Sequence, residues 1–133
     1  MIDHCVAFFY GARMAGKSSG KTLRPRFRVV CGRDIALGPG KVELLRTLAE
    51  VGSLNEAARR LKMSYMRAWL LVRTMNRCFR HPLITAERGG RKGGGMKVTE
   101  TGRQALALYE EIESAALAST GDSWRRLQRL LRS

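Results

Sequence analysis

Two serines that each cap the start of a helix constrain the fold of this chain more than any other feature. Ser53 and Glu56 form an S-x-x-E capping box, which predicts a short helix with alanines and a leucine on its buried side. A tight turn at Lys62–Met63 follows. Ser64 then caps a further helix that reaches Phe79. The sequence therefore predicts two short helices joined by a tight turn.

The second of these helices has two chemically different sides at about 100° per residue. Its predicted core side comprises Tyr65, Ala68, Trp69, Leu71, Val72, Met75 and Phe79. Its other side comprises Met66, Arg67, Leu70, Arg73, Thr74 and Arg77, with three arginines and no acid. We assign Trp69 to the core, and we favour a core position for Tyr65 with its hydroxyl turned outward.

The flanking sequence predicts the other elements of a small helical domain. We expect a strand at Phe27–Cys31 ended by Gly32, a helix from Pro39 to Gly52, strands at Leu83–Arg88 and Met96–Val98 around a basic glycine-rich tip, a long helix capped by Thr99, and a last short helix capped by Asp122. The domain prediction is a flexible basic arm at 1–24, a helix-turn-helix domain with the long helix at 25–120, and a short helix at 121–133.

The long helix carries an apolar seam, formed by Ala105, Tyr109, Ile112 and Ala116. We interpret this spacing as a packing and dimerisation surface, although a helix that only covers its own domain's core would have the same pattern. The expected fold class is mainly α with a small β wing: a winged helix-turn-helix with a long C-terminal dimerisation helix.

The net charge of the chain indicates the class of molecule that it binds. Lys and Arg number 25 against 11 for Asp and Glu, a net charge of +14 with a pI near 11.0, and all of this excess lies before residue 104. Such a charge favours a polyanion such as double-stranded DNA over small acidic metabolites. The apolar runs are too short to span a membrane, and three scattered cysteines suggest reduced thiols in the cytoplasm.

Two other motifs are weaker. Gly11–Ser18 satisfies G-x-x-x-x-G-K-[ST], but no helix or parallel sheet is predicted after it, so a small nucleotide-binding protein is only an alternative. Cys78-x-x-His81 lacks a credible second pair of zinc ligands. No nucleophile lies beside a base, so we expect no enzyme, no metal and no cofactor. A winged helix that binds another protein is a further alternative.

Several of these segments together resemble a known family. They are Gly52–Leu61, Met63–Tyr65, Ala68–Trp69, Met75–Asn76, the glycines at 89–95 and Thr99-x-x-Gly102. They resemble the DNA-binding domain of the ModE family of molybdate-responsive regulators over residues 25–118, and the Ser53–Ser64 part also resembles LysR-type helix-turn-helix domains. The resemblance implies a winged helix that dimerises through its N-terminal strand and last helix, usually before a separate molybdate-binding module.

Two departures from the family pattern follow. The sequence ends at Ser133, and we expect no direct binding of molybdate by this chain. Lys62 stands where these motifs usually have glycine, which costs on the order of 1 kcal/mol if this residue is left-handed.

The expected function is that of a homodimeric transcriptional regulator, associated with the nucleoid, that binds an inverted repeat in double-stranded DNA sequence-specifically. The candidate DNA-binding residues are Ser53, Ser64, Tyr65, Met66, Arg67, Leu70, Arg73, Arg77, Arg88, Arg91 and Lys92. The candidate dimerisation residues are Phe27, Val29, Ala105, Tyr109, Ile112 and Ala116.

Overall fold

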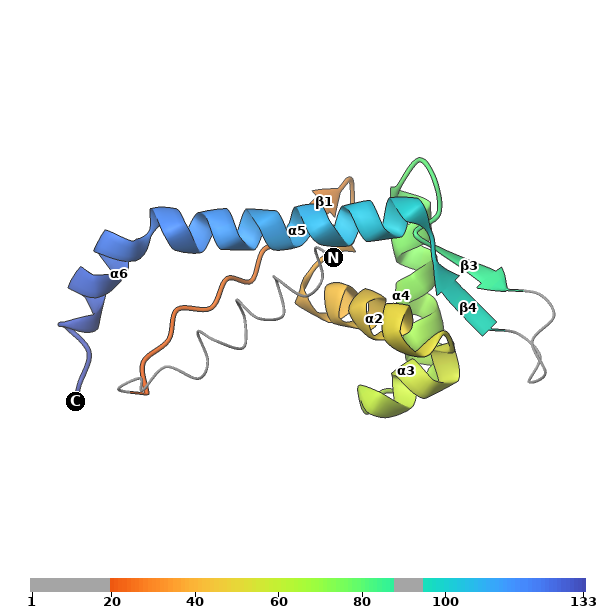
Figure 1. The fold of residues 1–133 in the computed structure, drawn as a ribbon, viewed down its shortest axis with the longest axis horizontal. Coiled ribbons are helices and arrows are strands. Elements are labelled where there is room, and N and C mark those ends of the chain that lie inside the picture. The colour runs from red at the N-terminus through yellow and green to blue at the C-terminus, as the bar shows by residue number, and fades with distance from the viewer. Residues whose placement is uncertain (1–19, 88–94) are drawn as a thin grey trace. The chain divides into compact units, whose positions relative to one another are not determined.

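A computed structural model describes residues 20–87 and 95–133 of the chain (Figure 1). In chain order the elements are β1 (Val29–Cys31), β2 (Asp34–Leu37), α2 (Pro39–Val51), α3 (Leu54–Arg60), α4 (Tyr65–Cys78), β3 (Ile84–Glu87), β4 (Gly95–Val98), α5 (Glu100–Ser119) and α6 (Gly121–Gln128). The chain forms two compact units, one at Arg26–Leu106 and one that includes Ala107–Ser133. None of the described helices is both long and apolar enough to cross a membrane.

The core of the Arg26–Leu106 unit lies among three helices and two hairpins. Helices α2, α3 and α4 pack on one another, β2 contacts α2 and α4, and β4 contacts α2. The fully buried large side chains are Leu44, Leu45, Leu48, Met75 and Leu83. The predicted class, mainly α with a small antiparallel wing, is confirmed.

Local sequence explains where the helices begin and end. Pro39 occupies the first turn of α2, and Gly52 ends it in the left-handed conformation (φ 65°) with its N–H donating to the Leu48 carbonyl oxygen. The Ser53 hydroxyl accepts from the Glu56 N–H at the start of α3, as the capping pattern predicts. Lys62 has φ 55°, so the turn between α3 and α4 does require a left-handed residue.

The N-terminal strand differs from its prediction. It is confined to Val29–Cys31, and Gly32 (φ 63°) leads into a return strand, β2, that the sequence pattern did not predict. The pairing is antiparallel, with Val30 opposite Ile35 and Cys31 opposite Asp34. The prediction treats Gly32 only as the end of a strand, whereas a left-handed glycine at this position forms part of a hairpin turn.

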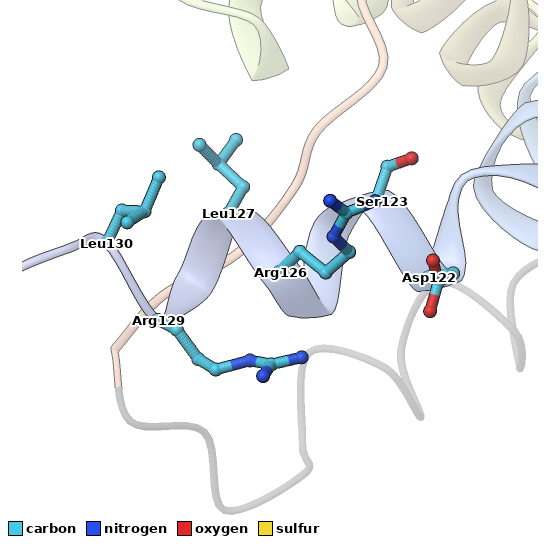
Figure 2. A pocket seen from close by; sticks show the side chains of 6 residues that line it. All are labelled: Asp122, Ser123, Arg126, Leu127, Arg129 and Leu130. Atoms are coloured by element: carbon cyan, nitrogen blue, oxygen red, sulfur yellow. The ribbon is translucent and has the colours of Figure 1, made fainter.

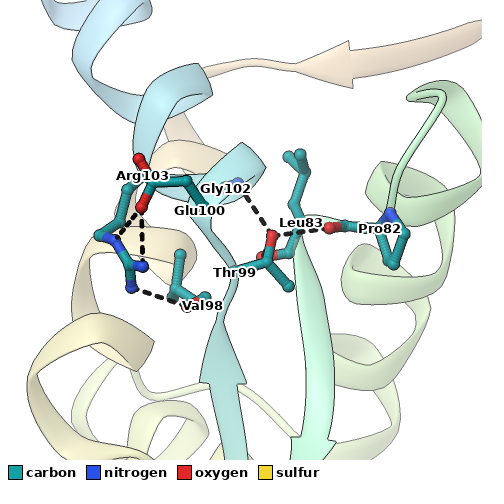
Figure 3. A network of polar contacts seen from close by, with 7 residues as sticks. All are labelled: Pro82, Leu83, Val98, Thr99, Glu100, Gly102 and Arg103. Carbon is teal, nitrogen blue, oxygen red and sulfur yellow. Dashed lines mark hydrogen bonds and ion pairs between the residues drawn. The ribbon is translucent and has the colours of Figure 1, made fainter.

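The wing is a two-stranded antiparallel hairpin in which Ile84 pairs with Val98 and Glu87 with Gly95. A polar junction connects its base to α5 (Figure 3). The Thr99 hydroxyl accepts from the Gly102 N–H at 3.0 Å and donates to the Pro82 carbonyl oxygen at 2.7 Å. Thr99 therefore caps α5, as predicted, and also holds the start of β3 beside it.

The last helix corrects one prediction. Helix α6 begins after Thr120, whose side chain makes no cap hydrogen bond, and Asp122 lies within the first turn. The residue at the cap position is Thr120 and not Asp122, which instead forms an ion pair with Arg125. The helix ends at Gln128, so Leu130 and Leu131 lie beyond it.

Candidate nucleic-acid interface

Helix α4 presents the predicted outer face to solvent. The Ser64 hydroxyl accepts from the Arg67 N–H at 3.1 Å and fixes the first turn. Ala68, Val72 and Met75 bury the opposite side. Met66, Arg67, Leu70, Arg73 and Arg77 are exposed, so these members of the predicted outer side do face solvent.

The two aromatic residues of α4 do not lie in the core. Trp69 is 37% exposed and Tyr65 is 49% exposed, which contradicts the core positions that we predicted. Helices α3 and α4 contact each other, and the small side chains Ala57, Ala58 and Ala68 of these helices are only 0–3% exposed. We attribute the difference to the small size of these buried side chains, since a core filled by alanines accommodates a large ring poorly. Placing residues at 100° per residue around the helix axis assigns each one to a side of the helix, but it takes no account of the space available there.

The arginines of α4 differ in their surroundings. The guanidinium of Arg73 lies over the Trp69 ring, 5.4 Å from its centroid. Arg77 forms a two-pronged ion pair with Asp34 of β2, at 3.1 Å and 3.3 Å. Within the part of the chain that the structure describes, Arg67 has no ion-pair partner. Arg67 is therefore the α4 arginine with most freedom to bind a phosphate or a base.

Asn76 connects α4 to the wing. Its amide nitrogen donates to the Ile84 carbonyl oxygen at 2.9 Å, and its side-chain oxygen accepts from the N–H groups of Leu83 (2.9 Å) and Ile84 (3.2 Å). The sequence pattern did not predict this positioning role, since Asn76 contributed only to the resemblance. An asparagine on a helix shortly before a proline turn is the signal that could have indicated it.

The other predicted contacts fall into two groups. Ser53 is half-buried, and its hydroxyl is used to cap α3. Arg88, Arg91 and Lys92 lie outside the described residues, as does the Gly11–Ser18 motif. The DNA contacts assigned to Arg88, Arg91 and Lys92 therefore remain predictions.

The predicted dimerisation residues differ in exposure. Phe27 (40%), Val29 (38%) and Ile112 (50%) are exposed, Ala105 and Ala116 are half-buried, and Tyr109 is 3% exposed. The single chain therefore already buries Tyr109. Leu108, which was not predicted, is 58% exposed one turn before Ile112.

Charge on the neighbouring helices is partly neutralised. Arg60 pairs with Glu50 at 3.1 Å, and Arg59 pairs with Glu56. The hydrogen bond and charge of Glu56 raise the pKa of Arg59 further above its usual value. These two arginines are already paired with carboxylates in the free protein.

The described residues give little support to a metal site or a catalytic site. No group of three His, Cys, Asp or Glu side chains there could hold a metal. Cys31 and Cys78 are free, and burial, followed by the charge of Asp34, raises the pKa of the Cys78 thiol. An open pocket of about 570 Å³ is lined by Asp122, Ser123, Arg126, Leu127, Arg129 and Leu130 (Figure 2), a set that contains no His or Cys.

A capped helix pair followed by a β wing defines a winged helix-turn-helix domain. Residues 40–103 match the family model of the bacterial regulatory helix-turn-helix proteins of the lysR family. The chain is also similar to two curated relatives named ModE. One is the molybdenum transport protein ModE of Azotobacter vinelandii, 38% identical over 59% of this chain and 29% of its own. The other is the transcriptional regulator ModE of Haemophilus influenzae, 36% identical over 58% and 30%.

These comparisons confirm the resemblance to the ModE DNA-binding domain, and the chain spans about 30% of the length of both relatives. Among solved structures, Lactococcus lactis ZitR in complex with DNA is similar at 17% identity with a TM-score of 0.48, over 99% of this chain and 86% of that one. A likeness of this size carries no functional argument.

Proposed function

We propose that this chain is a transcriptional regulator that binds double-stranded DNA sequence-selectively through α4. The observation that carries the proposal is the outer face of α4, which is held by the Ser64 cap, contains no acid and includes Arg67, an arginine without an ion-pair partner among the described residues. A helix of this kind fits the major groove, about 12 Å wide, where an arginine binds guanine edges bidentately. Similarity to ModE-type domains supports the same function.

We assign the DNA contacts of individual residues from their positions along α4. Tyr65, Met66, Arg67 and Leu70 belong to the first two turns and are assigned to the groove, with the Ser64 N-terminus near a phosphate. Arg73 and Arg77 lie further along α4 and are assigned to the flanking backbone. Arg88, Arg91 and Lys92 of the wing are assigned to phosphates on the strength of the sequence alone.

We also propose that the chain binds an inverted repeat as a homodimer. Exposed apolar side chains on β1 and α5, among them Val30 (66%), Leu108 and Ile112, support this assembly. Two copies of α4 held about 34 Å apart would meet half-sites about one helical turn apart. A regulator of this type acts where the DNA is, so we place it in the cytoplasm at the nucleoid.

Selection of bound fragments from random double-stranded DNA tests the proposal. We expect one enriched motif with two-fold symmetry, and we expect Arg67→Ala to lose preference at a single position of each half-site. Arg126→Ala of α6, which removes the same charge elsewhere, should keep the motif. Recovery of unenriched sequences by the unmodified protein would contradict sequence-selective binding.

A further inference from the structure

Four large apolar side chains are exposed together on the first two turns of α4. Their exposed fractions are 49% for Tyr65, 61% for Met66, 37% for Trp69 and 49% for Leu70. Residues three and four apart are neighbours on a helix surface, so these side chains form one continuous surface, which we call the α4 apolar patch. The buried residues of α4 are Ala68, Val72 and Met75, so the patch lies outside the core of the domain.

The charges around the patch limit what can cover it. Arg67 and Arg73 flank it, and no Asp or Glu occurs in α4. The whole chain carries a net charge of +14. The partner that complements this surface therefore combines negative charge with exposed apolar groups.

The major groove of DNA has this combination. Phosphates line its edges, and the 5-methyl group of thymine is the apolar feature that side chains can contact on its floor. Met66 and Leu70 lie one turn apart on the outer side of α4, and their flexible alkyl chains can adapt to a methyl group. A polar residue at either position would gain nothing from such a contact.

We propose that Met66 and Leu70 are specificity-determining residues that recognise thymine by its methyl group. This inference rests on the proposed function, because it requires α4 to enter the major groove. It adds a class of base, thymine in preference to cytosine, to the guanine or phosphate contact assigned to Arg67. Burial of one methyl-sized group changes affinity about fourfold, which sets the expected size of each contact.

Replacement of thymine by deoxyuridine in the selected duplex tests the inference, because uracil keeps every hydrogen-bonding group and lacks only the methyl. We expect the unmodified protein to bind the fully substituted duplex at least about fourfold more weakly. Single-position substitutions should locate the loss at a few thymines within each half-site. Equal affinity for both duplexes would overturn the inference.

Variants connect the effect to the two side chains. Met66→Ala and Leu70→Ala should bind the thymine duplex about fourfold more weakly and should discriminate less between thymine and uracil. Leu127→Ala of α6 is the matched control, since Leu127 is also 49% exposed, and it should keep the full discrimination. Thermal melting of each variant checks that it is folded.

The outcomes separate the inference from the function on which it rests. Strong preference for the selected duplex over a scrambled one, without sensitivity to uracil, overturns methyl recognition and leaves the proposed function intact. No preference for any sequence overturns both. Unchanged DNA affinity in Met66→Ala and Leu70→Ala overturns the inference and identifies the patch as a surface for something other than DNA.

Discussion

At the scale of single residues, Gly102 has no room for a side chain. An added Cβ would overlap the Leu83 carbonyl oxygen and would lie 2.7 Å from Cγ1 of Val98. The backbone at Leu83, just before β3, cannot move away easily, because Thr99 donates hydrogen bonds to the Leu83 carbonyl oxygen from both its N–H and its hydroxyl. The glycine of Thr99-x-x-Gly102 therefore lets α5 approach the wing closely.

We predict that Gly102→Ala lowers the free energy of unfolding by about 1–3 kcal/mol through overpacking. Urea denaturation measures the change. Gly40→Ala is the control, because Gly40 lies in α2 with no atom within 4 Å of an added Cβ. That control should be neutral or stabilising by up to about 1 kcal/mol. Similar stabilities for the two variants would contradict the packing argument.

Cys78 gives a prediction about pH. Its raised pKa, caused first by burial and then by the charge of Asp34, reduces the thiolate fraction at any given pH. Because the thiolate is the nucleophile, alkylation of Cys78 in the folded protein should require a higher pH than in the denatured protein. Iodoacetamide labelling followed by peptide mass spectrometry measures this. The same pH dependence of Cys78 alkylation in the folded and the denatured protein would contradict a raised pKa of this thiol.

At the scale of elements, the ion pair between β2 and the end of α4 holds Arg77 in the free protein. Asp34→Asn should release this arginine and increase DNA affinity, with the salt dependence steeper by up to about one unit. Both partners are well exposed, so stability should change by less than about 1 kcal/mol. Titrations at several salt concentrations measure the effect.

Asp122→Asn provides the matched control for Asp34→Asn. It also removes one exposed acid that is paired with an arginine, but in α6. An equal gain in affinity from both variants would mean that net charge alone is responsible, and that Arg77 does not contact DNA.

The sequence predicts the elements that begin with a local signal. Ser53, Ser64 and Thr99 cap helices where expected, because a cap depends on residues three positions away. Prediction from the sequence fails where packing against elements distant in the chain decides the position of a side chain. Helical angle alone places Trp69 in the core, where the structure does not have it, and the partners of Asn76 and Arg77 lie on other elements of the chain.

At the scale of the whole molecule, Ile112 tests the proposed dimer. Its side chain is 50% exposed in the single chain, so Ile112→Asp should fold normally and still dissociate a dimer that buries it. Leu130→Asp is the control, since Leu130 is 82% exposed beyond α6. Sedimentation velocity measures the assembly. A monomeric unmodified protein, or a dimer unaffected by Ile112→Asp, would contradict this interface.

The central claim is that α4 reads DNA sequence. The measurement that tests it most directly is the ratio of affinities for the selected and the scrambled duplex, determined for the unmodified protein and for Arg67→Ala at one salt concentration. We predict a ratio of at least about 10³ for the unmodified protein. We predict a decrease of about tenfold or more in this ratio for Arg67→Ala. A ratio near one, or a high ratio that Arg67→Ala leaves unchanged, would contradict the claim.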